Sequence, residues 1–501
     1  MAKAAYEELC AHSKKMFVLS SAASVLSWDQ ETGMPPGGGD LRALQLAELA
    51  ALSHERATDP RIDAWLKVCE QDAAMRSDLF LHANLRGMRR DYDRATLLPE
   101  SLVRELAATE SRAQKAWAQA RADSNYAGFQ PWLTRMLELQ RLKADCLKSS
   151  GQSRWDALAD LYEPGMNAAD LRALFTPLRK RLVELRAKLD ARGRKPDESL
   201  AKVEFEVPRQ EAFVRAVLSA MTFDFTRGRL DRSAHPFCCG TLDDVRLTTR
   251  FHKDNVLDAL GSTMHEGGHG LYEQGLDKDH QGTPLAEAVS LGIHESQSRL
   301  WENHVGKSRA FWQWCKQNAM RELGPLAVPF DADMIYRTAN VVSPSLIRVE
   351  ADEATYDLHV MVRFELETAL LHGDLDVKDL PLQWNRLYLD YLGVEVPDDR
   401  RGCLQDVHWS CGLFGYFPTY TLGNLYAAQF AAAARRAIPD FDDQLARGAF
   451  ADLREWLRSN IHQHGRRYTP SELCQRVTSA PLSSEAFLSY LEAKLCAVYE
   501  I

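Results

Sequence analysis

The stretch His265-Glu266-Gly267-Gly268-His269 matches the pattern HExxH and lies near the middle of the 501-residue chain. On a helix, residues four apart share one face, so His265 and His269 could offer imidazole nitrogens to a single metal ion. Glu266 lies beside them, where a base would take a proton from water at the metal. The alternative is a helix that merely carries two surface histidines.

The residues around this stretch favour a buried helix. Three glycines at positions 267, 268 and 270 each cost a helix about 0.5–1 kcal/mol relative to alanine. Either another helix or a bound substrate is therefore expected to approach the backbone closely there, and packing alone would also explain them. Apolar residues keep a helical period through the stretch, which predicts one inward-packed face: Val256, Leu257, Leu260, Met264 and Leu271.

A catalytic zinc site needs a third protein ligand and one open position. No histidine follows His269 at the spacing of the metzincin motif, which favours a carboxylate from a separate helix. The next helical segment, from Leu285 to Val305, offers five candidates, and chemistry alone does not choose among them: Glu287, Glu295, Glu302, His294 and His304.

The remaining sequence predicts long helices and very little sheet. Helical periods cover residues 1–29, 40–58, 61–97, 99–124, 129–151, 167–191 and 210–221. The one clear strand is Val245–Phe251, where apolar and polar residues alternate. If this is an edge strand beside the metal helix, it could hold an extended peptide by backbone hydrogen bonds.

Composition and charge argue against several classes of protein. A hydrophobic content of 45% and a charged content of 26% are ordinary for a globular protein. No stretch reaches 18 apolar residues, which predicts no membrane span, and a net charge of −9 argues against nucleic acid or an anionic membrane as the main partner. Ten cysteines without paired spacing suit a reducing compartment, and the first residues lack a signal-peptide layout. We therefore expect a cytoplasmic protein.

Several further motifs occur in order along nearly the whole chain. They are Ser27–Thr32, Tyr162–Met166, His235–Phe237, Asp244–Thr248, His294–Gln297, Ile347–Asp352 and Gly402–Trp409. Together with the HExxH stretch, they resemble the signatures of the M32 family of metallocarboxypeptidases, the carboxypeptidase Taq type. The resemblance implies that Glu295 is the third metal ligand.

The resemblance also implies a fold class and a domain organisation. A mainly α, large helical metallopeptidase body would enclose a deep substrate groove, with a small antiparallel β-sheet beside the HExxH helix. Residues 1–501 would form a single domain, in which 1–221 is a mostly helical half and groove wall and 222–501 is the catalytic half. A homodimer is implied as well.

The implied activity is metal-dependent release of C-terminal amino acids from peptides with a free carboxylate. His265, His269 and Glu295 would hold one divalent metal per chain. Zinc is the expected ion, and cobalt or manganese could satisfy the same ligands. Glu266 would act as the general base.

Other motif residues are expected to stabilise charge or limit the groove. His408 and Tyr420 are candidates for donating hydrogen bonds to the developing oxyanion, by analogy with related helical metallopeptidases. Asp244, Arg246 and Gln405 belong to motifs that, in the family, would close one end of the groove. A closed end would enforce cleavage from the C terminus.

Arg348 is the candidate for binding the substrate carboxylate, because a guanidinium can donate two parallel hydrogen bonds. Its spacing predicts that Arg348, Asp352, Thr355 and His359 share one helix face. The alternative is an internal ion pair between Arg348 and Asp352, and both arrangements could hold.

Two further histidines are not expected to bind the metal, and two alternative functions stay open. His235 and His294 are predicted to have structural or supporting roles, and His294, although next to Glu295, is expected to point elsewhere. An oligopeptide endopeptidase with an open groove is one alternative function. A noncatalytic peptide-binding protein with a structural metal is the other, but structural zinc sites usually close with four protein ligands.

Overall fold

Helices make up most of the structure, a computed structural model that describes residues 1–501. The chain forms two units, each assembled from three separate stretches. Unit 1 contains Met1–Thr96, Pro196–Ala339 and Tyr426–Leu482, and unit 2 contains Leu97–Lys195, Asn340–Leu425 and Ser483–Ile501. The expected single domain, with halves that meet near residue 221, and its groove stay predictions.

Unit 1 begins with five helices: α1 (Ala2–Thr32), α2 (Gly39–Ala57), α3 (Pro60–Gln71), α4 (Ala73–Ser77) and α5 (Leu79–Thr96). The sequence predicted one helix over residues 61–97, and this is wrong. Asp72 caps α4 by accepting a hydrogen bond from the backbone N–H of Met75, and Asp78 accepts from Phe80 and Leu81 at the start of α5. Aspartate at these positions favours a new helix start over a continuous helix.

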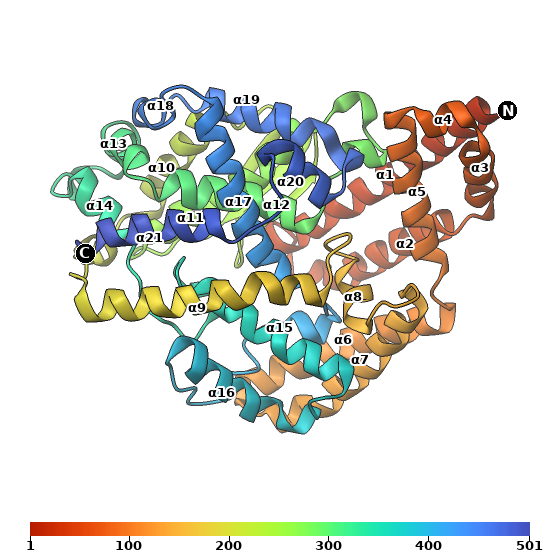
Figure 1. Cartoon of the computed structure of the whole chain (residues 1–501), viewed down its shortest axis with the longest axis horizontal. Coiled ribbons are helices and arrows are strands. Elements are labelled where there is room, and N and C mark those ends of the chain that lie inside the picture. Colours follow the sequence, from red (N-terminus) through yellow and green to blue (C-terminus); the bar gives the residue numbers. More distant parts are fainter. The chain divides into compact units, whose positions relative to one another are not determined.

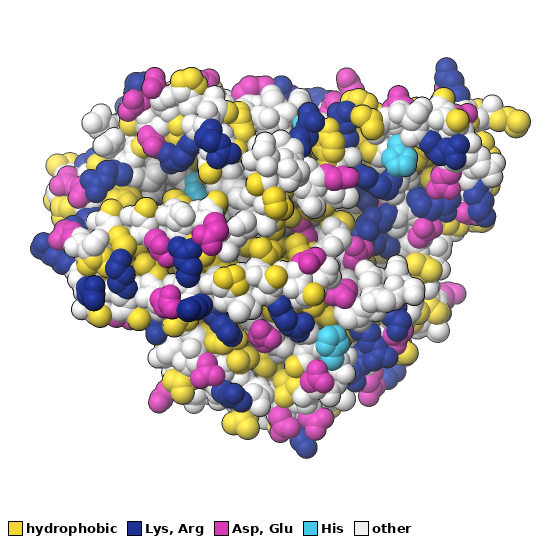
Figure 2. Space-filling view, viewed as in Figure 1, with side chains coloured by type: hydrophobic (Ala, Val, Ile, Leu, Met, Phe, Trp, Pro, Cys, Tyr) yellow, Lys and Arg dark blue, Asp and Glu magenta, His cyan; other side chains and the backbone are white.

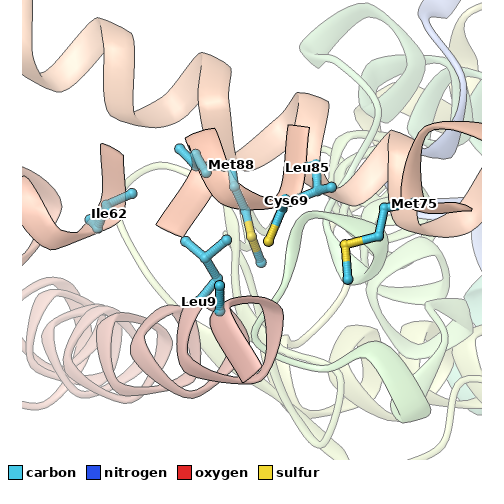
Figure 3. Packing of buried hydrophobic residues seen from close by; sticks show 8 residues of the cluster. Leu9, Ile62, Cys69, Met75, Leu85 and Met88 are labelled. Carbon is cyan, nitrogen blue, oxygen red and sulfur yellow. The ribbon is translucent and has the colours of Figure 1, made fainter. Parts of the chain in front are cut away.

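A hydrophobic cluster holds four of these helices together. Leu9 of α1 points toward Ile62 and Cys69 of α3, with Met75, Leu85 and Met88 from α4 and α5 around them (Figure 3). Cys69 and Leu66 have no exposed surface. Burial of such side chains stabilises the cluster by about 1.5–3 kcal/mol for each large apolar residue.

The sheet lies in unit 1 and has the strand order β1-β3-β2. Its strands are β1 (Gly228–Arg232), β2 (Cys238–Thr241) and β3 (Asp244–Thr249). β1 pairs with β3 in parallel and β2 pairs with β3 antiparallel, so the expected antiparallel sheet is mixed. The predicted strand is confirmed as β3, but it is central and has neighbours on both edges. The prediction that it is an edge strand able to bind a peptide is therefore wrong.

Unit 1 also contains the HExxH helix and its neighbours (Figure 1). Helix α11 (Val256–Gly275) contains the motif and packs against β3 and α12 (Leu291–Arg299). A π-helix, η5 (Leu300–Gly306), continues directly from α12. The remaining helices of this unit are α10 (Val207–Ala220), α13 (Arg309–Asn318), α14 (Ala332–Thr338), α18 (Phe441–Arg447), α19 (Ala451–Asn460) and α20 (Pro470–Thr478).

Unit 2 is helical. Trp155 and Phe175 pack edge-on against Phe364, with ring centroids 5.1 and 5.4 Å away, and form part of its core. Helix α17 (Pro418–Ala437) supplies residues to both units. The other helices are α6 (Glu100–Asp123), α7 (Tyr126–Leu147), α8 (Arg154–Ala159), α9 (Ala168–Arg192), α15 (Tyr356–His372), α16 (Leu380–Leu392) and α21 (Glu485–Val498).

The surface carries mixed charge. On the face shown in Figure 2, lysine and arginine side chains are interspersed with aspartate and glutamate.

No helix combines the length and the apolar character needed to cross a bilayer. All ten cysteines are free thiols.

Candidate metal centre

Helix α11 confirms the predicted buried helix. Asn255 caps its N terminus by accepting a hydrogen bond from the backbone N–H of Asp258 at 3.1 Å. The glycines of the motif are explained by close packing. A Cβ atom on Gly268 would lie 2.5 Å from the carbonyl oxygen of Gln297 in α12. Only glycine therefore allows α12 to lie this close to the HExxH turn.

Three side chains from these two helices converge. The Nε2 atoms of His265 and His269 lie 3.5 and 3.4 Å from Oε2 of Glu295. One potential ligand atom from each residue lies within 4.8 Å of the other two. Two imidazole nitrogens and one carboxylate oxygen are a donor set that binds zinc and similar divalent ions and leaves one position open.

Glu302, another candidate for the third ligand, contacts the opposite side of His265. Its Oε2 atom lies 2.9 Å from Nδ1 of His265. The π-helix η5 carries Glu302, so Glu295 and Glu302 reach the two nitrogens of one imidazole ring from consecutive helices. Glu287 is ruled out as a neighbour, because it is 49% exposed and pairs with Arg466.

His294 contacts the back of His269. The two Nδ1 atoms are 2.5 Å apart, and Nε2 of His294 lies 2.9 Å from Oε1 of Glu273. His294 thus points away from the nitrogen of His269 that faces Glu295, as expected, but it does support a residue of the cluster. The sequence reasoning did not identify Glu273, although its position four residues after His269 places it on the same helix face.

Arg299 also escaped the sequence reasoning, although it follows Glu295 by one helical turn. Its Nε donates to Oε1 of Glu295 at 2.8 Å and its NH1 donates to Oε2 of Glu302 at 3.3 Å. Burial alone would raise the pKa of both carboxyls, but Arg299 and His265, joined at Glu302 by Lys307, together outweigh it and hold each pKa well below its usual value. Both carboxylates are therefore ionised at neutral pH.

Glu266 differs from these carboxylates because no cation pairs with it. It is buried, and this burial raises the pKa of Glu266 to about 7. The cluster contains the carboxylates of Glu266, Glu273, Glu295 and Glu302 and the cations Arg299 and Lys307. Acidic side chains thus outnumber basic ones here, and two imidazole nitrogens face the same carboxylate oxygen. The residues present therefore fit a divalent metal.

Unit 2 contains a second buried polar cluster, around Arg348. Arg348 lies in a short 3-10 helix, η8 (Arg348–Glu350), and α15 begins only at Tyr356, so the predicted common helix face is wrong. An ion pair with Asp352 is also absent: Asp352 accepts hydrogen bonds from the backbone of Ser343 and from Thr355. Arg348 instead donates to Oδ1 of Asp406 from Nε and NH2, at 3.1 and 2.9 Å.

A second arginine shares the same carboxylate. Arg363, which has no exposed surface, donates to Oδ2 of Asp406 at 2.6 Å and to Gln405 at 2.7 Å. Burial lowers the pKa of His408 to about 3, so this histidine is neutral. One carboxylate between two guanidiniums leaves the cluster with an uncompensated positive charge.

His408 and Tyr420 lie beside this cluster in the same unit. Nε2 of His408 is 3.2 Å from the Tyr420 hydroxyl, and the Arg348 guanidinium carbon lies 4.8 Å from the centroid of the Tyr420 ring. Gln405 accepts a hydrogen bond from the backbone N–H of Arg348 at 2.9 Å. The structure thus brings Arg348, Gln405, His408 and Tyr420 together.

Asp244 and Arg246 lie in unit 1, on the face of the sheet opposite the buried Val245 and Leu247. Arg246 makes two hydrogen bonds of 2.9 Å with Asp244, and its guanidinium lies 4.4 Å from the ring centroid of Trp28 in α1. His235, by contrast, is exposed in the segment between β1 and β2.

Comparison with known proteins identifies the family of the chain. The family described as carboxypeptidase Taq (M32) metallopeptidase matches residues 8–495. The chain belongs to this family. It is 44% identical to thermostable carboxypeptidase 1 of Thermus thermophilus, over 99% of each chain, and 35% identical to carboxypeptidase 1 of Bacillus subtilis, over 97% of each.

Solved structures of this family share the fold. The crystal structure of the M32 carboxypeptidase from Deinococcus radiodurans superimposes with a TM-score of 0.96 at 38% identity, over 99% of this chain and 100% of that one. The Trypanosoma cruzi metallocarboxypeptidase 1 gives a TM-score of 0.94 at 35% identity, over 99% and 100%. The chain is therefore a metallocarboxypeptidase, and its family implies a divalent metal and peptide substrates.

Proposed function

We propose that this M32 enzyme releases single amino acids from the C termini of peptides, with the metal held by His265, His269 and Glu295. The convergence of these three side chains next to Glu266 is the observation that carries the proposal. Zinc is the proposed ion, although cobalt or manganese would satisfy the same ligands. When bound, the ion supplies Lewis-acid chemistry that polarises the scissile carbonyl and acidifies water.

Glu266 is the proposed general base. Its carboxylate is adjacent to the ligands, is buried and lacks a cationic partner, so it can accept a proton from the attacking water and later pass it to the leaving amine. A pKa near 7 suits both steps, because the group can exist in either form near neutral pH.

Arg348 is the proposed partner of the substrate carboxylate. A guanidinium has five N–H donors, and Arg348 uses three of them, two toward Asp406 and one toward Tyr356. Because Arg348 and Arg363 share a single carboxylate, a substrate carboxylate would supply the missing negative charge. Arg348 is only 4% exposed, and its guanidinium carbon lies 4.8 Å from the centroid of the Tyr420 ring.

The other predicted residues keep supporting roles in this proposal. His408, which is neutral, and Tyr420 can each donate a hydrogen bond to the developing oxyanion. Gln405 uses both ends of its amide inside the protein, and we propose that it acts by holding Arg348. Asp244 and Arg246, fixed by their bidentate pair, would limit how far the peptide extends beyond the scissile bond.

The proposal includes the setting of the enzyme. A cytoplasmic location is supported by ten free cysteines, which suit a reducing compartment. A homodimer rests on the resemblance to the family alone.

Matched peptides with free and amidated C termini separate the proposed exopeptidase from an oligopeptide endopeptidase. Stepwise release of residues from the free peptide alone supports the proposal. Equal cleavage of both peptides, at internal bonds, would overturn it.

A further inference from the structure

The two histidines of the metal centre have different supports behind them. Nδ1 of His265 contacts a carboxylate directly, at 2.9 Å from Glu302. Nδ1 of His269 contacts another imidazole, that of His294, whose ring plane is inclined by 29° to its own, with centroids 4.4 Å apart. The carboxylate of Glu273 then follows at 2.9 Å from the far nitrogen of His294.

This arrangement fixes the positions of the hydrogens. A nitrogen that binds a metal carries no hydrogen, so His269 must carry its hydrogen on Nδ1 if Nε2 is the ligand atom. Two facing Nδ1 atoms can share only one hydrogen, so His294 must accept there and carry its own hydrogen on Nε2. An ionised carboxylate only accepts hydrogen bonds, and Glu273 therefore selects that form of His294.

The opposite arrangement would prevent metal binding. If His294 carried its hydrogen on Nδ1, His269 would have to accept at Nδ1 and carry a hydrogen on Nε2. The latter atom faces Glu295, where the ion is proposed to bind. Tyr272 is fully buried, and its ring centroid lies 5.2 Å from that of His294. This packing restricts rotation of the His294 ring.

We infer that Glu273 and His294 are positioning residues that act in series to present Nε2 of His269 to the metal. The inference rests on the metal site of the proposed function. Partners of this kind, behind a ligating histidine, typically change metal affinity by about 10- to 100-fold when removed. Because Glu273 contacts His269 only through His294, its contribution should disappear when His294 is absent.

A double-mutant cycle on the full-length enzyme tests the series arrangement. Zinc affinity is measured by competition with a chromophoric chelator for wild type, Glu273→Gln, His294→Ala and the double variant. We expect each single substitution to weaken zinc binding by about 10- to 100-fold. The double variant should bind within about twofold of His294→Ala alone. If His294→Ala does not fold, His294→Gln replaces it in the cycle.

Two controls separate the possible failures. Glu287→Gln, which removes an exposed acid of the same unit, should keep wild-type affinity. Glu295→Gln should remove tight binding, and if it does not, the proposed metal site itself is wrong. If Glu295→Gln abolishes binding while Glu273→Gln leaves it unchanged, or if the single effects multiply in the double variant, only the inference is overturned.

Discussion

Substitution of Gly268 by alanine tests whether the spacing between α11 and α12 builds the metal centre. A Cβ atom at Gly268 would meet the carbonyl oxygen of Gln297 at 2.5 Å and the Cα atom of Ser298 at 2.7 Å, whereas ordinary contact begins near 3.4 Å. The helices must therefore separate locally by about 0.9 Å, the difference between 3.4 and 2.5 Å. That displacement would move Glu295, two residues before Gln297, away from His265 and His269.

The magnitude follows from two opposing effects. Overpacking typically costs about 1–3 kcal/mol, and replacing a helical glycine by alanine recovers about 0.5–1 kcal/mol. The free energy of unfolding of Gly268→Ala should therefore fall by up to about 2.5 kcal/mol. Metal ligands must lie within about 0.2 Å of their preferred distances, so zinc affinity should fall by about tenfold or more.

Gly261 is the matched control on the same helix. A Cβ atom there would meet nothing within 4 Å, so Gly261→Ala should gain the helix propensity without a clash. Urea unfolding of the metal-free variants and zinc competition give the two readouts. Gly261→Ala should unfold at higher urea concentration than wild type and bind zinc normally, and Gly268→Ala should do neither. Identical behaviour of the two variants would refute the argument.

Three further predictions concern the substrate, acid stability and the metal. Arg348→Ala should lower kcat/KM for free-carboxylate peptides by an amount equivalent to about 2–5 kcal/mol and leave residual cleavage of amidated peptides unchanged; an unchanged kcat/KM would remove Arg348 from this role. Burial lowers the pKa of His462 to about 3, so below about pH 6.5 the unfolded state binds more protons than the folded state does. The free energy of unfolding therefore decreases as the pH is lowered. The metal-free enzyme should lose about 2 kcal/mol from this group between pH 6.5 and 5, and His462→Gln should flatten that part of the urea midpoint profile. Chelation should abolish peptide cleavage and added zinc or cobalt should restore it, whereas activity that survives complete metal removal would contradict the proposed site.

The sequence was most informative where spacing along one helix determines geometry. The four-residue interval between His265 and His269 and the apolar period around it predicted α11 correctly. Glu295 came from the resemblance to the family, because residue chemistry alone could not separate it from Glu302. Both carboxylates do contact His265, on opposite sides of its ring. Local sequence does not reveal which nitrogen each would face.

Features that depend on distant parts of the chain were predicted less well. The partner of Arg348 is Asp406, which lies 58 residues away, and local spacing pointed instead to Asp352. The parallel pairing of β1 with β3 likewise depends on tertiary packing and gives no local signal. Glu273 and Arg299 differ, because each follows a metal-centre residue by four positions and could have been found by extending the helix-face argument.

The most direct test of the proposed mechanism compares wild type with Glu266→Gln at equal zinc occupancy, on a short peptide with an unblocked C terminus. Gln preserves the shape of the side chain but cannot accept the proton from water. Wild type should release C-terminal residues one at a time, and Glu266→Gln should lose about 10²-fold or more in kcat while it retains zinc. Full activity in the zinc-loaded variant would contradict the role of Glu266 as the general base.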